Sequence, residues 1–301
     1  SYNGEKYIRE QLDSILNQTI QDFEVVVCDD ASTDGTWSIL EEYKKKDSRF
    51  RIYKNEENLG FKKNFEKAIS LCKGSYIALS DQDDIWVYKH LEILLDNIGE
   101  YNIICGNSEI VNKNGVKIGK TLRSNMLFEV IDFSDHLKPY RLLYFSSPYQ
   151  GSAMLIRKEF FLKALPIPSG AISHDAWFAS LATFYGGIKY INKTVLYYRR
   201  HENNISGISK EKSFFLRIKN TKSERTIFQD RVCFINAIFS RVKTLNKSQK
   251  NILNKALEYH TKKKSRLYRF TQIPFRIKHY KLIYTTNSYK LLIPRLVKYL
   301  L

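Results

Sequence analysis

The chain has 301 residues, 43% of them hydrophobic and 27% charged, a composition typical of a folded globular protein with one large or two modest domains. It contains no run of about 18 apolar residues and no recognisable secretory signal peptide, so we expect neither a transmembrane helix nor a cleaved leader. The net charge of +18 is uneven: residues 205–301 carry 23 Lys and Arg against 4 Asp and Glu, whereas residues 1–204 carry 26 against 27.

Residues 3–110 alternate helical and strand patterns. Apolar stripes predict helices near 8–16, 36–46, 61–72 and 89–98, and β-branched runs predict strands at 23–28, 50–53, 75–80 and 102–110. This alternation predicts an α/β fold in which a mostly parallel sheet is flanked by helices.

The pattern after residue 110 is less regular. Asn112 to Gly115 has the composition of a hairpin turn, 151–156 reads as a strand, a helix opens at Ser173 and runs to about Tyr185, and 194–198 reads as a strand. From residue 212 onward the pattern is helical. Together with the change in net charge near residue 205, this helical pattern predicts an α/β domain over 1–207 and a basic, mainly helical region over 208–301.

The cysteines indicate the redox environment of the chain, and the first residue bears on where the natural chain starts. Its four cysteines are scattered in apolar contexts and predict buried thiols in a reducing cytosol rather than disulfides or a zinc site: Cys28, Cys72, Cys105 and Cys233. The sequence starts at Ser1 without a methionine, so we expect the natural start to lie upstream.

Asp81-Gln82-Asp83-Asp84 directly follows the expected strand Tyr76–Leu79. Two carboxylates about 4 Å apart repel by roughly 4 kcal/mol at an effective dielectric constant near 20, so a cation or several donors must offset the charge. Oxygen ligands of this kind suit Mg²⁺ or Mn²⁺, which often share a substrate phosphate. The alternative is a solvated acidic turn or a helix N-cap.

A second acidic pair, Asp29-Asp30, ends the expected strand 23–28 and precedes the polar turn 31–36. In an open α/β sheet, ligands bind outside the carboxyl ends of the strands. The two clusters are therefore expected on one edge, facing one ligand, although each Asp could instead cap a helix.

Neither GxGxxG nor GxxxxGK[ST] is present, which argues against dinucleotide and P-loop sites. The chain resembles the family 2 glycosyltransferases of the GT-A fold over about residues 1–207. The matching motifs are Ser1-Tyr2-Asn3-Gly4-Glu5, Asp29 to Thr36, Asn58-Leu59-Gly60 with Asn64, Asp81 to Trp86, His174-Asp175-Ala176-Trp177 and Tyr198 to Asn204. The last two motifs look most like bacterial rhamnosyltransferases that build surface polysaccharide. The family has a strand before the first motif, which is absent here.

The resemblance implies a nucleotide-sugar site. The residues it places around the donor are Tyr2, Asn3, Glu5, Asp29, Asp30, Ser32, Asn58, Asn64, Asp81, Gln82, Trp86, His174, Trp177, Arg199 and Arg200. Asp29 would accept hydrogen bonds from the base of a UDP- or dTDP-sugar, since a carboxylate is acceptor-only, or would only form its turn. The two tryptophans would stack on a sugar face, although such residues are more often core.

The same resemblance implies the metal site and the catalytic base. Asp81 and Asp83 match the DXD pair, Asp83 being the more direct ligand of Mg²⁺ or Mn²⁺, and His201 would add a ligand, contact the diphosphate or lie in a surface loop. Arg199 or Arg200 would pair with phosphate. Asp175 would be the base that deprotonates the acceptor hydroxyl, giving inversion by single displacement, or would only cap its helix.

The basic last third leaves alternatives open. A nucleic-acid-binding protein would use it, but no RNA- or DNA-binding motif is legible, so no nucleic acid is expected. Lys and Arg interleaved with Tyr and Phe over 267–301 suit an anionic membrane surface, or else a solvated or oligomeric helical region. A sugar nucleotidyltransferase is a further alternative. The expected partners are the donor and a saccharide or polyprenyl-diphosphate acceptor, in the cytoplasm or at the inner face of the membrane.

Overall fold

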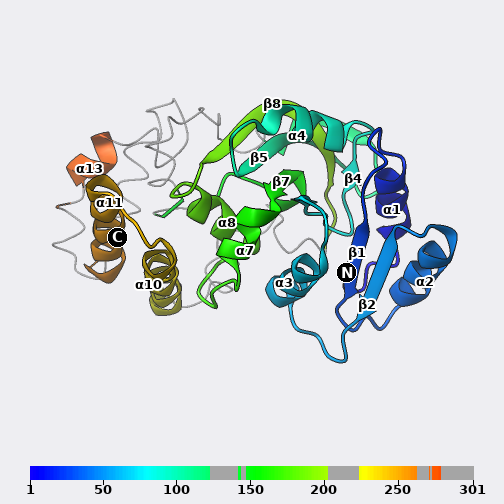
Figure 1. The fold of residues 1–301 in the computed structure, drawn as a ribbon, viewed down its shortest axis with the longest axis horizontal. Coiled ribbons are helices and arrows are strands. Elements are labelled where there is room, and N and C mark those ends of the chain that lie inside the picture. The colour runs from blue at the N-terminus through cyan, green and yellow to red at the C-terminus, as the bar shows by residue number, and fades with distance from the viewer. Residues whose placement is uncertain (123–141, 144–146, 203–223, 263–270, 272, 279–301) are drawn as a thin grey trace. The chain divides into compact units, whose positions relative to one another are not determined.

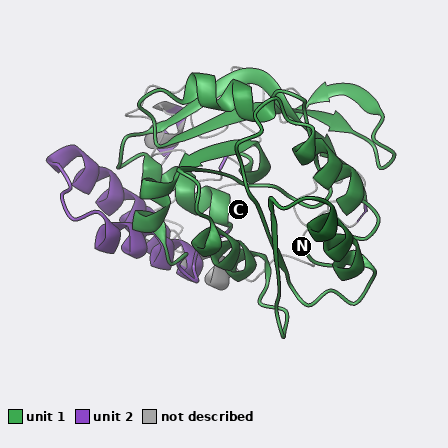
Figure 2. Ribbon diagram, turned by 45° about the vertical axis from the view of Figure 1, so that its right-hand side comes forward, with its two compact units in different colours: residues 1–122, 149–167, 173–201 green, residues 123–148, 168–172, 202–301 purple. Residues whose placement is uncertain are grey.

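A computed structural model of the chain describes residues 1–122, 142–143, 147–202, 224–262, 271 and 273–278. The chain forms two compact units (Figure 2). The first comprises residues 1–122, 149–167 and 173–201, and the second 123–148, 168–172 and 202–301. The expectations for Asn203 and Asn204, for 205–223 and for most of 263–301 lie outside the described residues.

The first unit holds the α/β fold shown in Figure 1. Its elements in chain order are α1 (Ile8–Leu16), β1 (Val25–Asp29), α2 (Thr36–Lys46), β2 (Phe50–Lys54), α3 (Phe61–Leu71), β3 (Tyr76–Ala78), β4 (Ile85–Trp86), α4 (His90–Ile98), β5 (Ile103–Val111), β6 (Lys117–Thr121), η1 (Gly151–Ala153), β7 (Met154–Arg157), α7 (Lys158–Ala164), α8 (His174–Ala182) and β8 (Ile188–Arg199). The helices and strands expected up to residue 111 are confirmed, with ends that differ by a few residues. The strand expected at 151–156 is a 3₁₀ turn followed by β7.

The sheet is mixed rather than mostly parallel. Among the described residues, one sheet has the order β3-β7-β5-β8-β4, with β6 also paired to β5, and β1 and β2 form a second, parallel pair. β5 and β8 are parallel, whereas β7 runs antiparallel to both β3 and β5. The α/β fold is as expected, but the sheet is mixed because β7 enters antiparallel between β3 and β5 and β4 pairs antiparallel with β8, pairings that helix–strand alternation does not predict.

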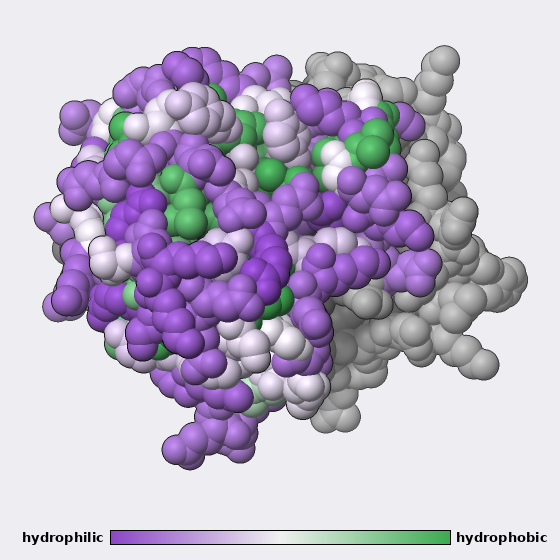
Figure 3. All heavy atoms as spheres, turned by 90° about the vertical axis from the view of Figure 1, so that its right-hand side faces the viewer, coloured by the Kyte–Doolittle hydropathy of each residue, from purple (hydrophilic) through white to green (hydrophobic). Residues whose placement is uncertain are grey.

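Burial of one apolar face per helix holds the unit together. Ile8 and Leu12 of α1 and Leu94 of α4 are almost fully buried. α1 packs on β4, α3 on β1, and α4 on β5, β7 and β8. Figure 3, which views the right-hand side of Figure 1, shows a mostly hydrophilic surface with small hydrophobic patches.

Strand pairing brings the acidic loop, residues 81–84, to the end of β8. β4 follows the loop directly and pairs antiparallel with β8, which sets Ile85 opposite Tyr197 and Trp86 opposite Leu196. Asp83 and Asp84 therefore lie beside Arg199 and His201, more than 110 residues later in the chain.

The second unit contains α10 (Glu224–Arg241), α11 (Lys247–Lys262) and α13 (Ile273–Lys278). α10 packs on α11, and Ile235 of α10 and Leu253 of α11 are fully buried. Buried polar groups secure residues 142–143: Nη1 of Arg231 donates to the carbonyl of Leu142 at 3.3 Å, and Nε2 of His260 lies 3.0 Å from that of Leu143. No helix within the described ranges is long and apolar enough to cross a membrane.

Candidate active site

Asp84 anchors the acidic loop through buried hydrogen bonds. Its side chain is completely buried, Oδ1 accepts the backbone N–H of Arg199 at 3.1 Å, and Oδ2 accepts the hydroxyl of Ser152 at 2.8 Å. Gln150 donates to the same Oδ2 at 3.3 Å. Asp84 therefore ties the loop to η1 and to the end of β8 and is not presented to a ligand.

Asp83 points the other way. Its side chain is 19% exposed, and Oδ2 lies 2.8 Å from Nε2 of His201. The ring of His201 stacks on Tyr7, with centroids 4.7 Å apart. A carboxylate oxygen and an imidazole nitrogen thus meet at the edge of the loop.

Negative charge gathers around Asp81. Burial, followed by the charges of Asp83 and Asp175, raises the pKa of Asp81 to about 7. Burial and the charges of Asp81 and Asp83 likewise raise the pKa of Asp84 well above its usual range. Such a cluster favours either bound protons or a bound cation.

The donor set fits a hard divalent cation in part. Carboxylate oxygens and one imidazole are ordinary ligands of Mg²⁺ and Mn²⁺. Within the described ranges, however, no group of three or more His, Cys, Asp and Glu residues is arranged to hold a metal by itself. An ion here would take one or two protein ligands, with waters and substrate phosphate completing its shell, as Mg²⁺ commonly does.

Asp175 lies in the first turn of α8. Ser173 caps this helix by accepting the N–H of Ala176 at 3.4 Å, and Oδ1 of Asp175 accepts the same N–H at 2.7 Å. Gly151 packs closely here: a Cβ at residue 151 would lie 3.0 Å from Nε2 of His174 and 3.4 Å from Cβ of Asp175. Asp175 is thus both a helix-capping group and close enough to Asp81 to raise its pKa.

The loop 1–5 is joined to the turn 31–36 and to Gln82. Gln82 exchanges two hydrogen bonds with the backbone of Tyr2, at 2.7 and 2.8 Å. The N–H of Asn3 donates to Oγ of Ser32 at 2.9 Å, and Oε2 of Glu5 accepts the N–H of Gly35 at 2.9 Å. The expected donor-side residues Tyr2, Asn3, Glu5, Ser32 and Gln82 are therefore together on one edge, and Tyr2 is 47% exposed.

Other expected donor-side residues support the backbone instead. Asp29 is fully buried and accepts from Ser32, and Asp30 accepts the N–H groups of Leu59 and Gly60. Asn64 donates to the carbonyl of Cys28 at 2.8 Å, and exposed Asn58 accepts the N–H of Gly60. In this arrangement Asp29 forms its turn, the alternative that the sequence left open, and its contact with a nucleotide base stays a prediction.

Both tryptophans lie in the core, so neither offers a ring face to a sugar. Trp177 is fully buried and donates to the carbonyl of Ala164 at 2.8 Å, and Trp86 stacks on His90 with centroids 4.0 Å apart. His174 is also buried and stacks on Phe65 at 4.1 Å.

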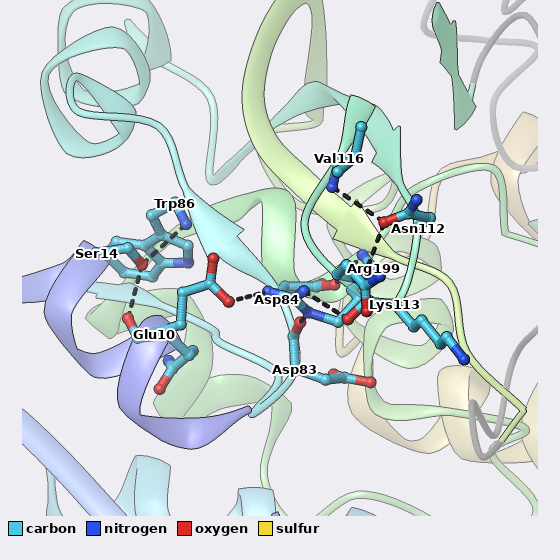
Figure 4. Close-up of polar contacts among 11 residues, drawn as sticks. Glu10, Ser14, Asp83, Asp84, Trp86, Asn112, Lys113, Val116 and Arg199 are labelled. Atoms are coloured by element: carbon cyan, nitrogen blue, oxygen red, sulfur yellow. Dashed lines mark hydrogen bonds and ion pairs between the residues drawn. The ribbon is translucent and has the colours of Figure 1, made fainter. Parts of the chain in front are cut away.

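Arg199 is 1% exposed and donates to Asp83, Lys113 and Glu10 (Figure 4), so the expectation that it pairs with phosphate does not hold in this arrangement. Arg200 is half-buried, and its N–H donates to Val111 at 2.9 Å. Sequence reasoning missed Tyr7, Glu10, Gln150 and Ser152, which contact these groups, because nothing in their local pattern distinguishes them from ordinary helix or strand residues.

The comparisons with known proteins agree with this fold. Residues 1–164 match the profile of Glycosyl transferase family 2. An uncharacterised glycosyltransferase of Methanocaldococcus jannaschii is 28% identical over 79% of this chain and 83% of its own length. The Escherichia coli UDP-Glc:alpha-D-GlcNAc-diphosphoundecaprenol beta-1,3-glucosyltransferase WfgD is 37% identical over 40% of this chain and 47% of its own.

Two solved structures share the fold. Staphylococcus aureus TarS 1-349 in complex with UDP-GlcNAc superposes with a TM-score of 0.59 at 21% identity, over 90% of this chain and 73% of that one. The mannosyltransferase PcManGT of Pyrobaculum calidifontis, solved with GDP-Man and Mn²⁺, gives 0.56 at 20% identity, over 86% and 67%. The chain belongs to Glycosyl transferase family 2 and is a glycosyltransferase with a GT-A-like fold.

Proposed function

We propose that the chain is an inverting, divalent-metal-dependent glycosyltransferase that moves a sugar from a nucleotide diphosphate sugar to a saccharide or polyprenyl-diphosphate-linked acceptor in surface polysaccharide synthesis. One observation carries the proposal: the charges of Asp83 and Asp175 both raise the pKa of Asp81, and Oδ2 of Asp83 lies 2.8 Å from Nε2 of His201. This is where a diphosphate with its cation and a reacting hydroxyl can meet.

The metal would be held by Asp83 and His201, with Asp81 alongside. When bound, Mg²⁺ or Mn²⁺ supplies Lewis-acid stabilisation of the departing nucleotide diphosphate. The raised pKa of Asp81, caused by burial and by Asp83 and Asp175, supports a cation here, since a divalent ion offsets the same repulsion. The Mn²⁺ in PcManGT adds support.

The nucleotide would lie along the edge formed by Tyr2, Asn3, Ser32 and Gln82. These residues are ordered by each other's hydrogen bonds, so the edge is preorganised. A UDP- or dTDP-sugar is the proposed donor. UDP-sugars in the names of WfgD and the TarS complex support uridine, whereas rhamnose as the transferred sugar rests on the sequence resemblance alone.

Asp175 would remove the proton from the acceptor hydroxyl as that oxygen attacks the anomeric carbon. With one carboxylate in that role and no covalent intermediate, the reaction is a single displacement that inverts the anomeric centre. The acceptor named for WfgD, a diphosphoundecaprenol-linked sugar, supports a lipid-linked acceptor here. That acceptor would place this enzyme in the cytoplasm, at the inner face of the membrane.

A thermal-shift panel tests the proposal. A ligand that binds only the folded state stabilises it by mass action. At 100 times its Kd the unfolding free energy rises by about 2.7 kcal/mol, and the melting temperature rises with it. We expect a UDP- or dTDP-sugar to raise the melting temperature with Mn²⁺ or Mg²⁺ present and to do so much less with EDTA. Equal shifts with and without the metal would contradict metal dependence, and no shift from any nucleotide sugar would contradict the donor assignment.

A further inference from the structure

The guanidinium of Arg199 is the buried centre of the contacts around the acidic loop. Its Nε donates to the backbone carbonyl of Asp83 at 2.9 Å, its Nη1 to the carbonyl of Lys113 at 3.1 Å, and its Nη2 to the carboxylate of Glu10 at 2.5 Å (Figure 4). The side chain is 2% exposed while that of Glu10 is 54% exposed. Arg199 thus joins the loop to α1 and to the turn of the β5–β6 hairpin.

A second route leads from Arg199 to the same aspartate. Its guanidinium carbon lies 4.9 Å from the ring centroid of Tyr7, and that ring stacks on His201 at 4.7 Å with an interplanar angle of 29°. His201 then contacts Oδ2 of Asp83 at 2.8 Å. Arg199 therefore supports Asp83 directly at its carbonyl and indirectly through Tyr7 and His201.

The surroundings leave the guanidinium little freedom. Around Gly115, a Cβ would lie 3.3 Å from Oε1 of Glu10 and 3.5 Å from Nη1 of Arg199, so the hairpin turn closes over the pair. The planar fork of arginine satisfies three acceptors in fixed directions, which a lysine ammonium cannot reproduce. A buried charge of this kind is costly to leave unpaired, so its partners stay in place.

We propose that Arg199 is a positioning residue for the metal: it sets the geometry of Asp83 and His201 without touching the ion. This inference rests on the proposed function, because it assumes a divalent cation at these two side chains. Partners that orient metal ligands typically contribute roughly 10–100-fold to metal affinity.

The direction in which the Mn²⁺ affinity changes when Arg199 is replaced distinguishes a positioning role from a purely electrostatic one. A positive guanidinium near a divalent cation repels it, so its removal would tighten binding if charge alone mattered. Positioning has the opposite consequence: a loosened Asp83–His201 pair binds the ion more weakly. Arg199→Lys keeps the charge and loses the fork, whereas Arg199→Met loses both.

The test is the Kd for Mn²⁺ alone, measured on the full chain by electron paramagnetic resonance of free Mn²⁺, with the thermal midpoint of every variant recorded. We expect Kd to rise roughly 10–100-fold in Arg199→Lys and Arg199→Met. The matched control is Arg9→Met: Arg9 lies on α1 and pairs with Glu42 of α2 at 2.8 Å, and both side chains are about half exposed. Its Kd should equal that of the wild type.

Folded Arg199 variants that bind Mn²⁺ as tightly as the wild type, or more tightly, would overturn the inference. If neither variant folds, Tyr7→Ala is the test, because it removes the ring that stacks between Arg199 and His201. Tyr7→Phe is its control, because it keeps that ring. A weaker Mn²⁺ affinity only in Tyr7→Ala supports positioning, and equal affinities overturn it. A wild type that binds no Mn²⁺, either alone or together with UDP, would refute the proposed metal dependence itself, so the two failures are distinguishable.

Discussion

Nε2 of His201 lies 2.8 Å from Oδ2 of Asp83, a contact between residues 118 positions apart in the chain. The atoms in contact are the ones through which each residue would bind a metal. The hydrogen bond therefore holds the two proposed ligand groups together, and a cation bound there would take the place of the proton between them.

Asp83→Asn should abolish Mn²⁺-dependent donor binding while preserving the fold. The amide keeps the volume and can still hydrogen-bond to His201, but it loses the negative charge that attracts the ion. We expect at least about a 100-fold rise in the Mn²⁺ Kd, since even an outer partner contributes roughly 10–100-fold. Calorimetric titration of Mn²⁺ with UDP measures it, and an unchanged affinity would refute the assignment of Asp83.

Asp175→Asn should retain donor affinity and lose transfer. Removal of a general base typically lowers the rate by roughly 10²–10⁴-fold, whereas the cap of α8 survives through Ser173. The measurements are kcat for transfer and the donor Kd. Asp96→Asn, at an exposed position on α4, serves as the control. If Asp175→Asn turns over at the wild-type rate, Asp175 only caps its helix.

Much of the first unit was predictable because its signals are local. The helix at Thr36–Lys46 has the bounds that the sequence indicates, and both acidic clusters follow strands as expected. The mixed sheet was not predictable, because the position of β7 between β3 and β5 depends on pairing between segments about 50 to 80 residues apart. Alternation of helix and strand carries no information on such pairing.

In the candidate site, too, some residues could be predicted from the sequence and others could not. Asp83 and His201 each stood out in a motif, and the fold brings them together. Arg199 stood out too, but its role changed, because sequence cannot tell an exposed arginine that meets phosphate from a buried one that meets carbonyl groups. Glu10 and Ser152 had no signal, since their importance comes only from what they contact.

If the membrane alternative for residues 267–301 extends over the rest of the basic region, neutralising the lysines of α11 should weaken binding to anionic vesicles. Lys247, Lys250 and Lys255 are all exposed on this helix. Each basic residue near anionic headgroups contributes about 1 kcal/mol, so changing all three to Gln should weaken binding by roughly 100-fold. Sedimentation with phosphatidylserine-containing and phosphatidylcholine vesicles at low salt measures the effect.

The matched control for this experiment is the triple Gln variant of Lys44, Lys45 and Lys46, which are exposed on α2 in the other unit. It changes the net charge equally, so equal losses in both variants would indicate a general charge effect rather than a surface on α11. Wild-type binding should fade at 1 M salt, where the screening length is about 3 Å. Tight binding to nucleic acid at physiological salt, without vesicle binding, would favour the nucleic-acid alternative.

His90 should make folding stability fall in mild acid. It is fully buried, stacks on Trp86, and its Nδ1 lies 2.8 Å from the carbonyl of Val195, to which it donates. Burial lowers the pKa of His90 to about 4 from an ordinary value of 6.5. The neutral ring is therefore favoured in the fold, and this stabilisation is complete above pH 6.5 and is lost as the pH falls from 6.5 to 4.

His90→Asn isolates this contribution. The amide can place a donor near the Nδ1 position, so the contact with Val195 is retained while the titrating group is removed. One pKa unit corresponds to about 1.4 kcal/mol, so the wild type should lose about 3 kcal/mol more than the variant between pH 6.5 and pH 4. The raised pKa values of Asp81 and Asp84 act in the opposite sense over this range, but both proteins share them. Urea unfolding from pH 4 to 7.5 measures the difference, and parallel pH profiles for the two proteins would show that His90 is not held neutral.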